Sequence, residues 1–447
     1  MKKVFFVAGM FLLTLFINAC SSDEEKQLNE PPLPQPEQAE PQEKPQDNPR
    51  VSDSIVVDML PATRDIELTP EQMAFAQKNN EFAFNLYRAI HEAQEKKQSN
   101  ITSPLSATFV LGMLNDGARG ETAAEITRML GFGESDRQAV NEYCKAFIEQ
   151  APIADPSVVL QIADIVAADK TVELVPAYQQ HMLDYYSADV ASLDFGDPSA
   201  LDYLNGWCNE KTQGMIPKIL DNLNEETRLV LMNAIFFKAT WTEKFDESDT
   251  REETFTKADG TEVSLPMMYR KAEILYREDD LYSCVRLPFG SGDKYSMFVL
   301  LPAEGKTVDD VINGLTNDFW SQSEYANFSR AVVDLKLPRF STESDIRLNE
   351  PVAKLGAPSM FDEDVADFTG MSTNYKRLFV DLMKQKAAIE VTEEGAKMSA
   401  VTVARMDSAM DNPVLKSATF HANRPFVYLI QERGTRTIFF IGTFQGD

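Results

Sequence analysis

The segment AKMSAVTVARMDS, residues 396–408, constrains the fold more than any other part of the chain. One set of alternating positions carries no charge: Ala396, Met398, Ala400, Thr402, Ala404, Met406 and Ser408. The other set holds every charge of the segment, at Lys397, Arg405 and Asp407. Segregation with a period of two is typical of a β-strand with one buried face.

The uncharged side chains of this segment are mostly small, and polar stretches flank it on both sides. Small inward residues suit a strand that slips between two existing strands better than one that nucleates a core. Gly395 provides a permissive backbone where such a segment would hinge. Pro413 has no N–H for a central strand, so insertion should stop before it. On this pattern alone, a plain strand or an exposed loop is the alternative.

The rest of the chain predicts an α+β fold. Thr69-Pro70-Glu71 should open a long amphipathic helix that runs to about Glu95. A second helix should begin at Ser103-Pro104, and a third should span Glu121–Leu130. Strand-like runs follow at 158–167, 229–238, 296–301, 331–337, 426–430 and 437–441. Helices early and strands late indicate large antiparallel or mixed sheets in one domain, residues 62–447.

The N-terminus has the pattern of an export signal. Lys2 and Lys3 precede an apolar run, so residues 1–19 are predicted to be a signal peptide. The ending Ile17-Asn18-Ala19-Cys20 resembles the lipobox of bacterial lipoproteins, which predicts lipidation of Cys20. Residues 20–61 are rich in Pro, Glu and Gln and should form a stalk. We therefore expect a protein anchored to the outer membrane of a Gram-negative bacterium. Acidic residues after Cys20 resemble surface-export signals, although a solvated tail explains them equally well.

Composition excludes several classes of function. A net charge of −27 argues against nucleic acid, which requires clustered Lys and Arg. Beyond Cys20 the cysteines are widely spaced, so buried structural thiols are expected at Cys144, Cys208 and Cys284. The three histidines are scattered, and His91 is interpreted as a surface residue. Because no nucleophile–base motif is visible, we expect neither an enzyme nor a cofactor or metal.

Several ordered motifs resemble the serpin family. Asn100–Ser106 is similar to its N-x-x-x-S-P-x-S helix opening, and Asn205–Ile216 to its N-x-W-x…T-x-G-x-I helix. Leu231–Trp241 resembles the central strand of its main sheet. Further matches lie at Phe255–Met268, Leu337–Phe340, Ala366–Gly370 and Phe420–Phe426. The resemblance covers the chain from about Thr69 onward.

This resemblance implies three β-sheets, about nine helices and an exposed reactive-centre loop near residues 393–416. In the family, a protease cleaves this loop, and the loop inserts into the main sheet with the protease still attached. The hinge would be Glu393, Glu394, Gly395 and Ala396. The inserting inward face would be Met398, Ala400, Thr402 and Ala404. The family's usual spacing places the scissile bond at Ala409–Met410, which favours elastase- or subtilisin-like proteases. Cleavage after Arg405 would suit trypsin-like enzymes but would leave a short strand.

Two residues depart from the family pattern. Met398 occupies an inward position where the family prefers alanine, although Met is unbranched and adaptable. Gln385 stands where the family usually has a histidine that helps to hold the sheet-opening region. That region would comprise Ser103, Ser106, Asn205, Trp241 and Gln385. We expect Gln385 to bond Ser106 or Asn205.

The predicted function is therefore suicide inhibition of serine endopeptidases, with cysteine endopeptidases as a further target class. The alternative is a non-inhibitory binding or scaffold protein on the same fold. The expected partners are target proteases, through a covalent acyl complex, and the membrane, through the N-terminal lipid. We expect a monomer. Few basic residues lie between Gly133 and Pro156, so no heparin site is expected.

Overall fold

The computed structural model describes residues 62–94, 98–133, 136–224, 226–317, 320, 327–396 and 415–447. These residues all lie in one compact unit, Met59–Asp447. The predicted signal peptide, Cys20 and the stalk lie outside the described residues.

The first helices begin where the sequence predicts. Helix α1 spans Pro70–Ala93, and Thr69 forms a capping box with Gln72. Helix α2 spans Pro104–Gly117, with the Ser103 hydroxyl accepting a hydrogen bond from the Ser106 N–H. Helix α3 spans Gly120–Met129, within one residue of its predicted bounds. The other described α-helices are α4 Arg137–Gln150, α5 Pro176–Tyr186, α6 Pro198–Lys211, α7 Val308–Gly314 and α9 Asn349–Lys354.

The main sheet has six strands in the order β10-β11-β12-β4-β2-β3. Their bounds are β10 Phe340–Arg347, β11 Lys384–Thr392, β12 Gly395–Ala396, β4 Leu229–Thr240, β2 Val158–Asp169 and β3 Asp189–Leu193. Strands β2 and β4 pair along almost their whole length, from Val158 opposite Ala239 to Ala168 opposite Leu229. The predicted strands at 158–167 and 229–238 are thereby confirmed as neighbours.

A second sheet has nine strands, with the path β1-β15-β14-β8-β7-β6-β9-β13 and β5 paired to β6. Their bounds are β1 Asn100–Thr102, β15 Ile438–Phe444, β14 Phe426–Glu432, β8 Tyr295–Pro302, β7 Tyr282–Phe289, β6 Glu262–Glu278, β9 Ser329–Pro338, β13 Lys416–His421 and β5 Arg251–Thr256. The α+β class is confirmed, but the described residues form two sheets where the resemblance implies three. Strand β6 causes this difference because it pairs β5 and β9 along most of its length and β7 at its end.

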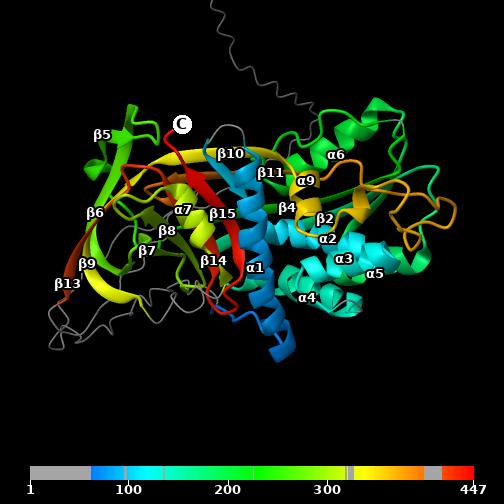
Figure 1. Ribbon diagram of the computed structural model, residues 1–447, viewed down its shortest axis with the longest axis horizontal. Coiled ribbons are helices and arrows are strands. Elements are labelled where there is room, and N and C mark those ends of the chain that lie inside the picture. Colours follow the sequence, from blue (N-terminus) through cyan, green and yellow to red (C-terminus); the bar gives the residue numbers. More distant parts are fainter. Residues whose placement is uncertain are drawn as a thin grey trace, which may run out of the picture. The chain divides into compact units, whose positions relative to one another are not determined.

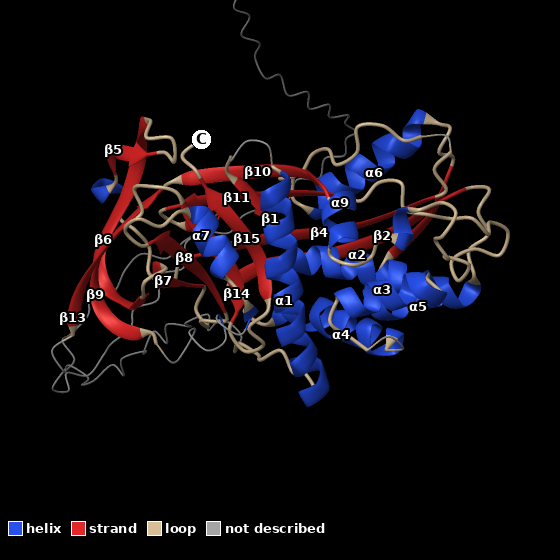
Figure 2. Ribbon diagram, viewed as in Figure 1, coloured by secondary structure: helices blue, strands red, loops and turns tan. Residues whose placement is uncertain are grey.

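Helices and strands are unevenly distributed over the described body. Helices α2–α5 pack together at the right of the view, whereas β5, β6, β9 and β13 lie at the left (Figures 1 and 2). Strand β12 belongs to the six-stranded sheet and β13 is an edge strand of the nine-stranded sheet. The intervening segment, 397–414, therefore connects the two sheets along the sequence.

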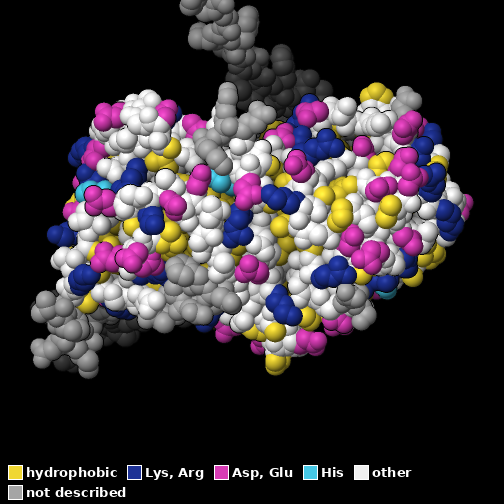
Figure 3. Space-filling view, in the orientation of Figure 1, with side chains coloured by type: hydrophobic (Ala, Val, Ile, Leu, Met, Phe, Trp, Pro, Cys, Tyr) yellow, Lys and Arg dark blue, Asp and Glu magenta, His cyan; other side chains and the backbone are white. Residues whose placement is uncertain are grey.

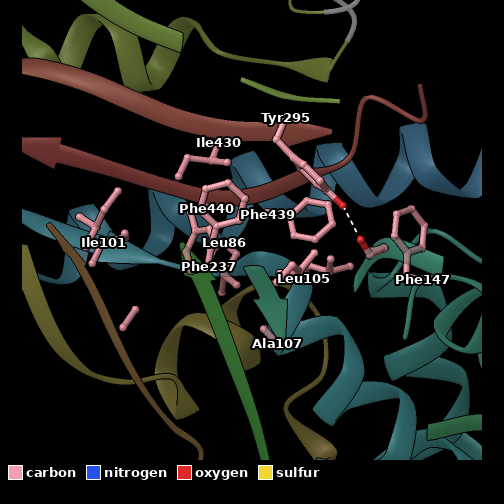
Figure 4. Close-up of a cluster of buried hydrophobic side chains, with 14 of the residues drawn as sticks. Leu86, Ile101, Leu105, Ala107, Phe147, Phe237, Tyr295, Ile430, Phe439 and Phe440 are labelled. Carbon is pink, nitrogen blue, oxygen red and sulfur yellow. Dashed lines mark hydrogen bonds between the residues drawn. The ribbon is translucent and has the colours of Figure 1, made fainter. Parts of the chain in front are cut away.

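The largest hydrophobic core lies between the two sheets and helices α1, α2 and α4. Figure 4 shows Phe237 of β4 beside Phe439 and Phe440 of β15. The Phe237 and Phe440 ring centroids are 6.3 Å apart. The Tyr295 hydroxyl donates to the Ala151 carbonyl at 2.7 Å, so even the polar end of this buried ring is satisfied.

The structure corrects one sequence interpretation and confirms another. His91 is not a surface residue: it is 3% exposed, and its Nε2 lies 2.7 Å from a carboxylate oxygen of Asp309. Its partner is more than 200 positions away, so the sequence around His91 carried no sign of it. Cys144, Cys208 and Cys284 are free and buried, as predicted.

The visible surface carries both signs of charge. In Figure 3, Lys and Arg alternate with Asp and Glu over the face shown, without a continuous basic area among the described residues. Within the described part of the chain, no helix combines the length and apolar character needed to cross a membrane.

Candidate functional site: the hinge and the slot between β4 and β11

The predicted hinge begins a strand inside the main sheet. Ala396 lies opposite Val391 of β11 on one side and Ala239 of β4 on the other. Gly395 is similarly placed between Thr392 and Thr240. Ala396 is 2% exposed. The alternating segment therefore starts as a buried central strand, with its first uncharged residue on the core face.

Gly395 is required by both its backbone and its surroundings. Its φ angle is +134°, a region that residues with a Cβ rarely adopt. A Cβ built on Gly395 would lie 2.3 Å from the Ala239 carbonyl oxygen. The close turn from β11 into β12 consequently depends on glycine at this position.

Glu393 anchors the turn before the hinge. Its carboxylate accepts bonds from Arg339 Nε at 3.0 Å and Arg339 Nη2 at 2.6 Å, a bidentate arrangement. The Thr250 hydroxyl donates a third bond at 2.6 Å. Burial alone would raise the pKa of Glu393, but the bonds from Arg339 and Thr250 outweigh it and lower that pKa. The hinge turn is thus held by a buried carboxylate.

Trp241 lies at the same end of the sheet and bonds the residues around the hinge turn. Its indole N–H donates to the Thr392 carbonyl at 2.9 Å, and its backbone N–H donates to the Glu394 carbonyl at 2.9 Å. The indole stacks on Phe289, with ring centroids 4.5 Å apart and an interplanar angle of 11°. Lys244 forms an ion pair with Glu394 beside it. Trp241 therefore positions both the end of β11 and the start of β12.

The opposite end of the sheet is open. Beyond Ala396, β4 and β11 are not paired with each other among the described residues. Between their first halves lies a cavity of about 430 Å³. Its apolar lining comes from α2, β4 and the segment before β11, including Val110, Leu114, Leu231, Met371 and Met383. We call the unpaired interval between β4 and β11, from Ala396 to this cavity, the slot.

Gln385 lies at the edge of this cavity and is fully engaged with the backbone before α2. Its side-chain oxygen accepts from the Ser103 N–H at 2.9 Å and from the Thr102 hydroxyl. Its amide nitrogen donates to the Ser103 carbonyl at 2.9 Å. The expected bond to Ser106 or Asn205 is therefore wrong, because the start of α2 presents its backbone to Gln385 first. Ser106 lines the cavity, and its backbone N–H donates to the capping hydroxyl of Ser103.

Asn205 has a different role from the predicted one. Its oxygen accepts from the N–H groups of Ile219 and Leu220, and its amide donates to the Leu220 carbonyl. It therefore holds the loop that follows α6 and does not meet Gln385. Asn233 of β4 lines the cavity together with Gln385. Its place in the middle of the predicted strand 229–238, as a lone polar residue among apolar ones, was the available signal.

Several predicted residues lie outside the described residues. They are Met398, Ala400, Thr402, Ala404 and the proposed scissile pair Ala409 and Met410. Their roles stay predictions.

Comparison with known proteins identifies the family. The family model described as Serpin (serine protease inhibitor) matches residues 77–445. The chain belongs to the serpin family. Serpins are protease inhibitors and not enzymes, and they typically bind target serine proteases.

Relatives of this serpin come from several different organisms. It is 32% identical to iripin-2 of Ixodes ricinus over 83% of this chain and 93% of that protein. It is 31% identical to the leukocyte elastase inhibitor of Equus caballus, over 84% and 99% of the two chains. An uncharacterized serpin-like protein of Thermococcus kodakarensis is 30% identical, over 89% and 92%.

Solved serpin structures match the fold over most of the described body. The thermophilic serpin tengpin in the native state aligns with a TM-score of 0.75 at 27% identity, covering 86% of this chain and 96% of that one. Thyroxine-binding globulin in complex with thyroxine aligns with a TM-score of 0.73 at 26% identity, covering 83% and 98%.

Proposed function

We propose that this serpin is a suicide inhibitor of serine endopeptidases, with cysteine endopeptidases as a further target class. A protease cleaves the segment after the hinge, and the freed strand fills the slot between β4 and β11. The observation that carries the proposal is β12, because Gly395 and Ala396 already pair with both slot strands in one register.

Continuing this register assigns a place to each following residue. Each step along the chain moves one residue back along both β4 and β11. Met398 would then lie between Ile389 and Phe237, and Ala400 between Ala387 and Ile235. Ala404 would lie between Met383 and Leu231. The β11 members of these rows are buried, so the uncharged set of the alternating segment would face the core.

The one polar inward residue meets polar neighbours in this register. Thr402 would lie between Gln385 of β11 and Asn233 of β4, two polar residues that line the cavity. Asn233 Oδ1 is buried without a hydrogen-bond partner among the described residues. A threonine hydroxyl there could donate to it, and satisfying a buried acceptor favours insertion. This agreement between the loop and the slot adds to the support that the hinge gives the proposal.

The length of the slot fits a large displacement of the protease. In the continued register, Met406 lies opposite Leu229, the first residue of β4. At about 3.4 Å per residue, the strand from Ala396 to Ala409 would carry an attached protease roughly 45 Å. About ten new backbone pairs at about 1 kcal/mol each would supply on the order of 10 kcal/mol. Such a release is sufficient to distort a catalytic geometry.

We further propose cleavage at Ala409–Met410. A small residue before the cut favours elastase- or subtilisin-like proteases with small or medium apolar pockets. Cleavage after Arg405 would leave a strand too short to reach the first residue of β4. Trypsin-like proteases should therefore be poor targets.

We also propose that Cys20 carries a lipid that anchors the protein to the outer membrane of a Gram-negative bacterium. The signal-like residues 1–19 and the stalk composition support this. Labelling cells with a radioactive fatty acid should mark the wild type and leave Cys20→Ala unmarked. Equal labelling of both would contradict the anchor.

The inhibitory proposal is tested by mixing the full chain with pancreatic elastase or subtilisin. The expected product is an SDS-resistant complex, with intact mass placing the cut after Ala409. Complete cleavage without any complex, by both proteases, would contradict suicide inhibition.

A second candidate function is binding without inhibition. Met398 favours it, because a long side chain would have to pass between Ile389 and Phe237 during insertion. A solved structural relative is itself described as a complex with thyroxine. Under this alternative, cleavage of the loop leaves the thermal stability of the body unchanged.

A further inference from the structure

Asp164 of β2 is a carboxyl group buried beside the slot. It lies directly opposite Asn233 in the β2–β4 register, so the two side chains share one face of the sheet. Asp164 is 1% exposed. Asn233 Nδ2 donates to Asp164 Oδ1 at 3.0 Å, whereas Asp164 Oδ2 is buried without a partner among the described residues. Such a half-satisfied carboxyl group is unusual enough to require an explanation.

Helices α2, α4 and α5 pack near Asp164, and the groups that they bring close to it are polar but carry no positive charge. Cys144 of α4 and Tyr186 of α5 lie close enough for the Asp164 charge to raise both of their pKa values, which burial raises first. Gly112 of α2 lets this group pack closely, because a Cβ there would lie 2.5 Å from the Tyr186 hydroxyl and 3.2 Å from the Cys144 sulfur. Among the described residues, no cation pairs with Asp164.

A chain of hydrogen bonds runs from Tyr186 to the surface. The Tyr186 hydroxyl donates to Asn141 Oδ1 at 2.8 Å. Asn141 Nδ2 donates to Asp116 Oδ1 at 2.7 Å, and His181 Nδ1 lies 3.0 Å from the same oxygen. The His181 side chain is 41% exposed. Hydrogen bonds therefore link Tyr186, which lies near Asp164, to a surface histidine.

We propose that Asp164 is a positioning residue for loop insertion, and that its protonation state sets how readily the β2–β4 pair shifts to admit the loop. The neutral carboxyl group needs no cation beside it, holds Asn233 and keeps the sheet closed. The carboxylate leaves an unpaired charge at Oδ2, which weakens the closed arrangement and promotes opening. The proposal rests on the insertion mechanism above and concerns its regulation.

The titration falls in a useful range. Burial raises the pKa of Asp164 to about 7, and the bond from Asn233 offsets this only in part. A folded-state pKa above the unfolded value means that the folded state binds more protons. The stability of the intact body should therefore fall as pH rises from about 4 to about 7, and change little from this group above that.

The test compares the full chain with Asp164→Asn and with Asp334→Asn as a matched control. Asp164→Asn keeps an oxygen for Asn233 and removes the titration. Asp334 pairs with His421 on the nine-stranded sheet, outside the slot. Each protein is melted, and the rate of insertion after loop cleavage is followed, from about pH 5.5 to about pH 8.

We expect the wild type and Asp334→Asn to lose several degrees of melting temperature and to insert severalfold faster at the higher pH. Asp164→Asn should show a flat profile for both quantities. The same slope in Asp164→Asn as in the wild type would overturn the proposal. If no insertion occurred in any variant, the inhibitory function would fail, while the melting profile would still test the Asp164 titration separately.

Discussion

The two ends of the slot differ in how firmly they are held. At the hinge end, Glu393 is fixed by Arg339 and Thr250, and Trp241 is stacked on Phe289. At the other end, β4 and β11 border a cavity of about 430 Å³. The rigid end defines the register in which a strand can add, and the open end leaves the space that the strand must fill. Insertion should therefore start at β12 and proceed toward the cavity.

The largest expected effect comes from blocking the rigid end. Ala396→Arg would place a charge between Val391 and Ala239 on the core face, and burying an unpaired charge costs several kcal/mol. The variant should be cleaved as a substrate and form no SDS-resistant complex with elastase or subtilisin. Ala396→Ser is the matched control and should still inhibit. Unchanged inhibition by Ala396→Arg would refute insertion at this position.

Filling the open end should have the next largest effect. Leu231 of β4 lines the cavity, and in the continued register it neighbours Ala404. Leu231→Trp should leave the intact body stable but weaken the cleaved form by about 1–3 kcal/mol, since the inserted strand would be overpacked. Denaturant unfolding of the cleaved protein measures this. Val159→Trp, on an exposed position of β2, is the control. Equal behaviour of both variants would show that the loop does not reach the cavity.

Loosening the hinge anchor should cost about 2 kcal/mol. Glu393→Gln removes the charge-assisted bonds to Arg339. Because the pKa of Glu393 is lowered from its ordinary value of 4.5 in the folded state, its stabilisation is complete at neutral pH and is lost as pH falls through the folded pKa. The stability difference between wild type and variant should shrink in acid. A difference independent of pH would contradict the ionic role of Glu393.

The smallest effect should come from Lys244→Ala. Its ion pair with Glu394 is partly exposed, and such pairs contribute about 0.2–1 kcal/mol. Inhibition should persist with nearly unchanged kinetics. A large loss would mean that Glu394, and not Glu393, anchors the hinge.

The sequence predicted the parts of the structure that depend on local pattern. The helix starts at Thr69 and Ser103 follow from capping chemistry, and the parity of the 396–408 segment agrees with Ala396 as far as the structure describes it. Contacts between distant segments were not visible. His91 meets Asp309 and Gln385 meets Ser103 across more than 200 residues each. Asn205 was chosen as the asparagine of this region, although the polar Asn233 within the strand at 229–238 offered a signal.

Local sequence pattern also could not predict that the strands beyond the main sheet form one nine-stranded sheet. Strand β6 is long enough to pair β5, β9 and β7, and so it joins strands that would otherwise form separate sheets. These pairings involve segments that are distant in the sequence. Asp164 illustrates the same limit, because an aspartate within an apolar run gives no sign of whether a cation or an amide faces it.

After cleavage, the loop should become a strand between β4 and β11. The most direct measurement is the melting temperature of the full chain before and after a single cut at the loop. Insertion worth on the order of 10 kcal/mol predicts a rise of about 10 °C or more for a body of this size. An unchanged melting temperature after complete cleavage would contradict insertion and leave the non-inhibitory alternative.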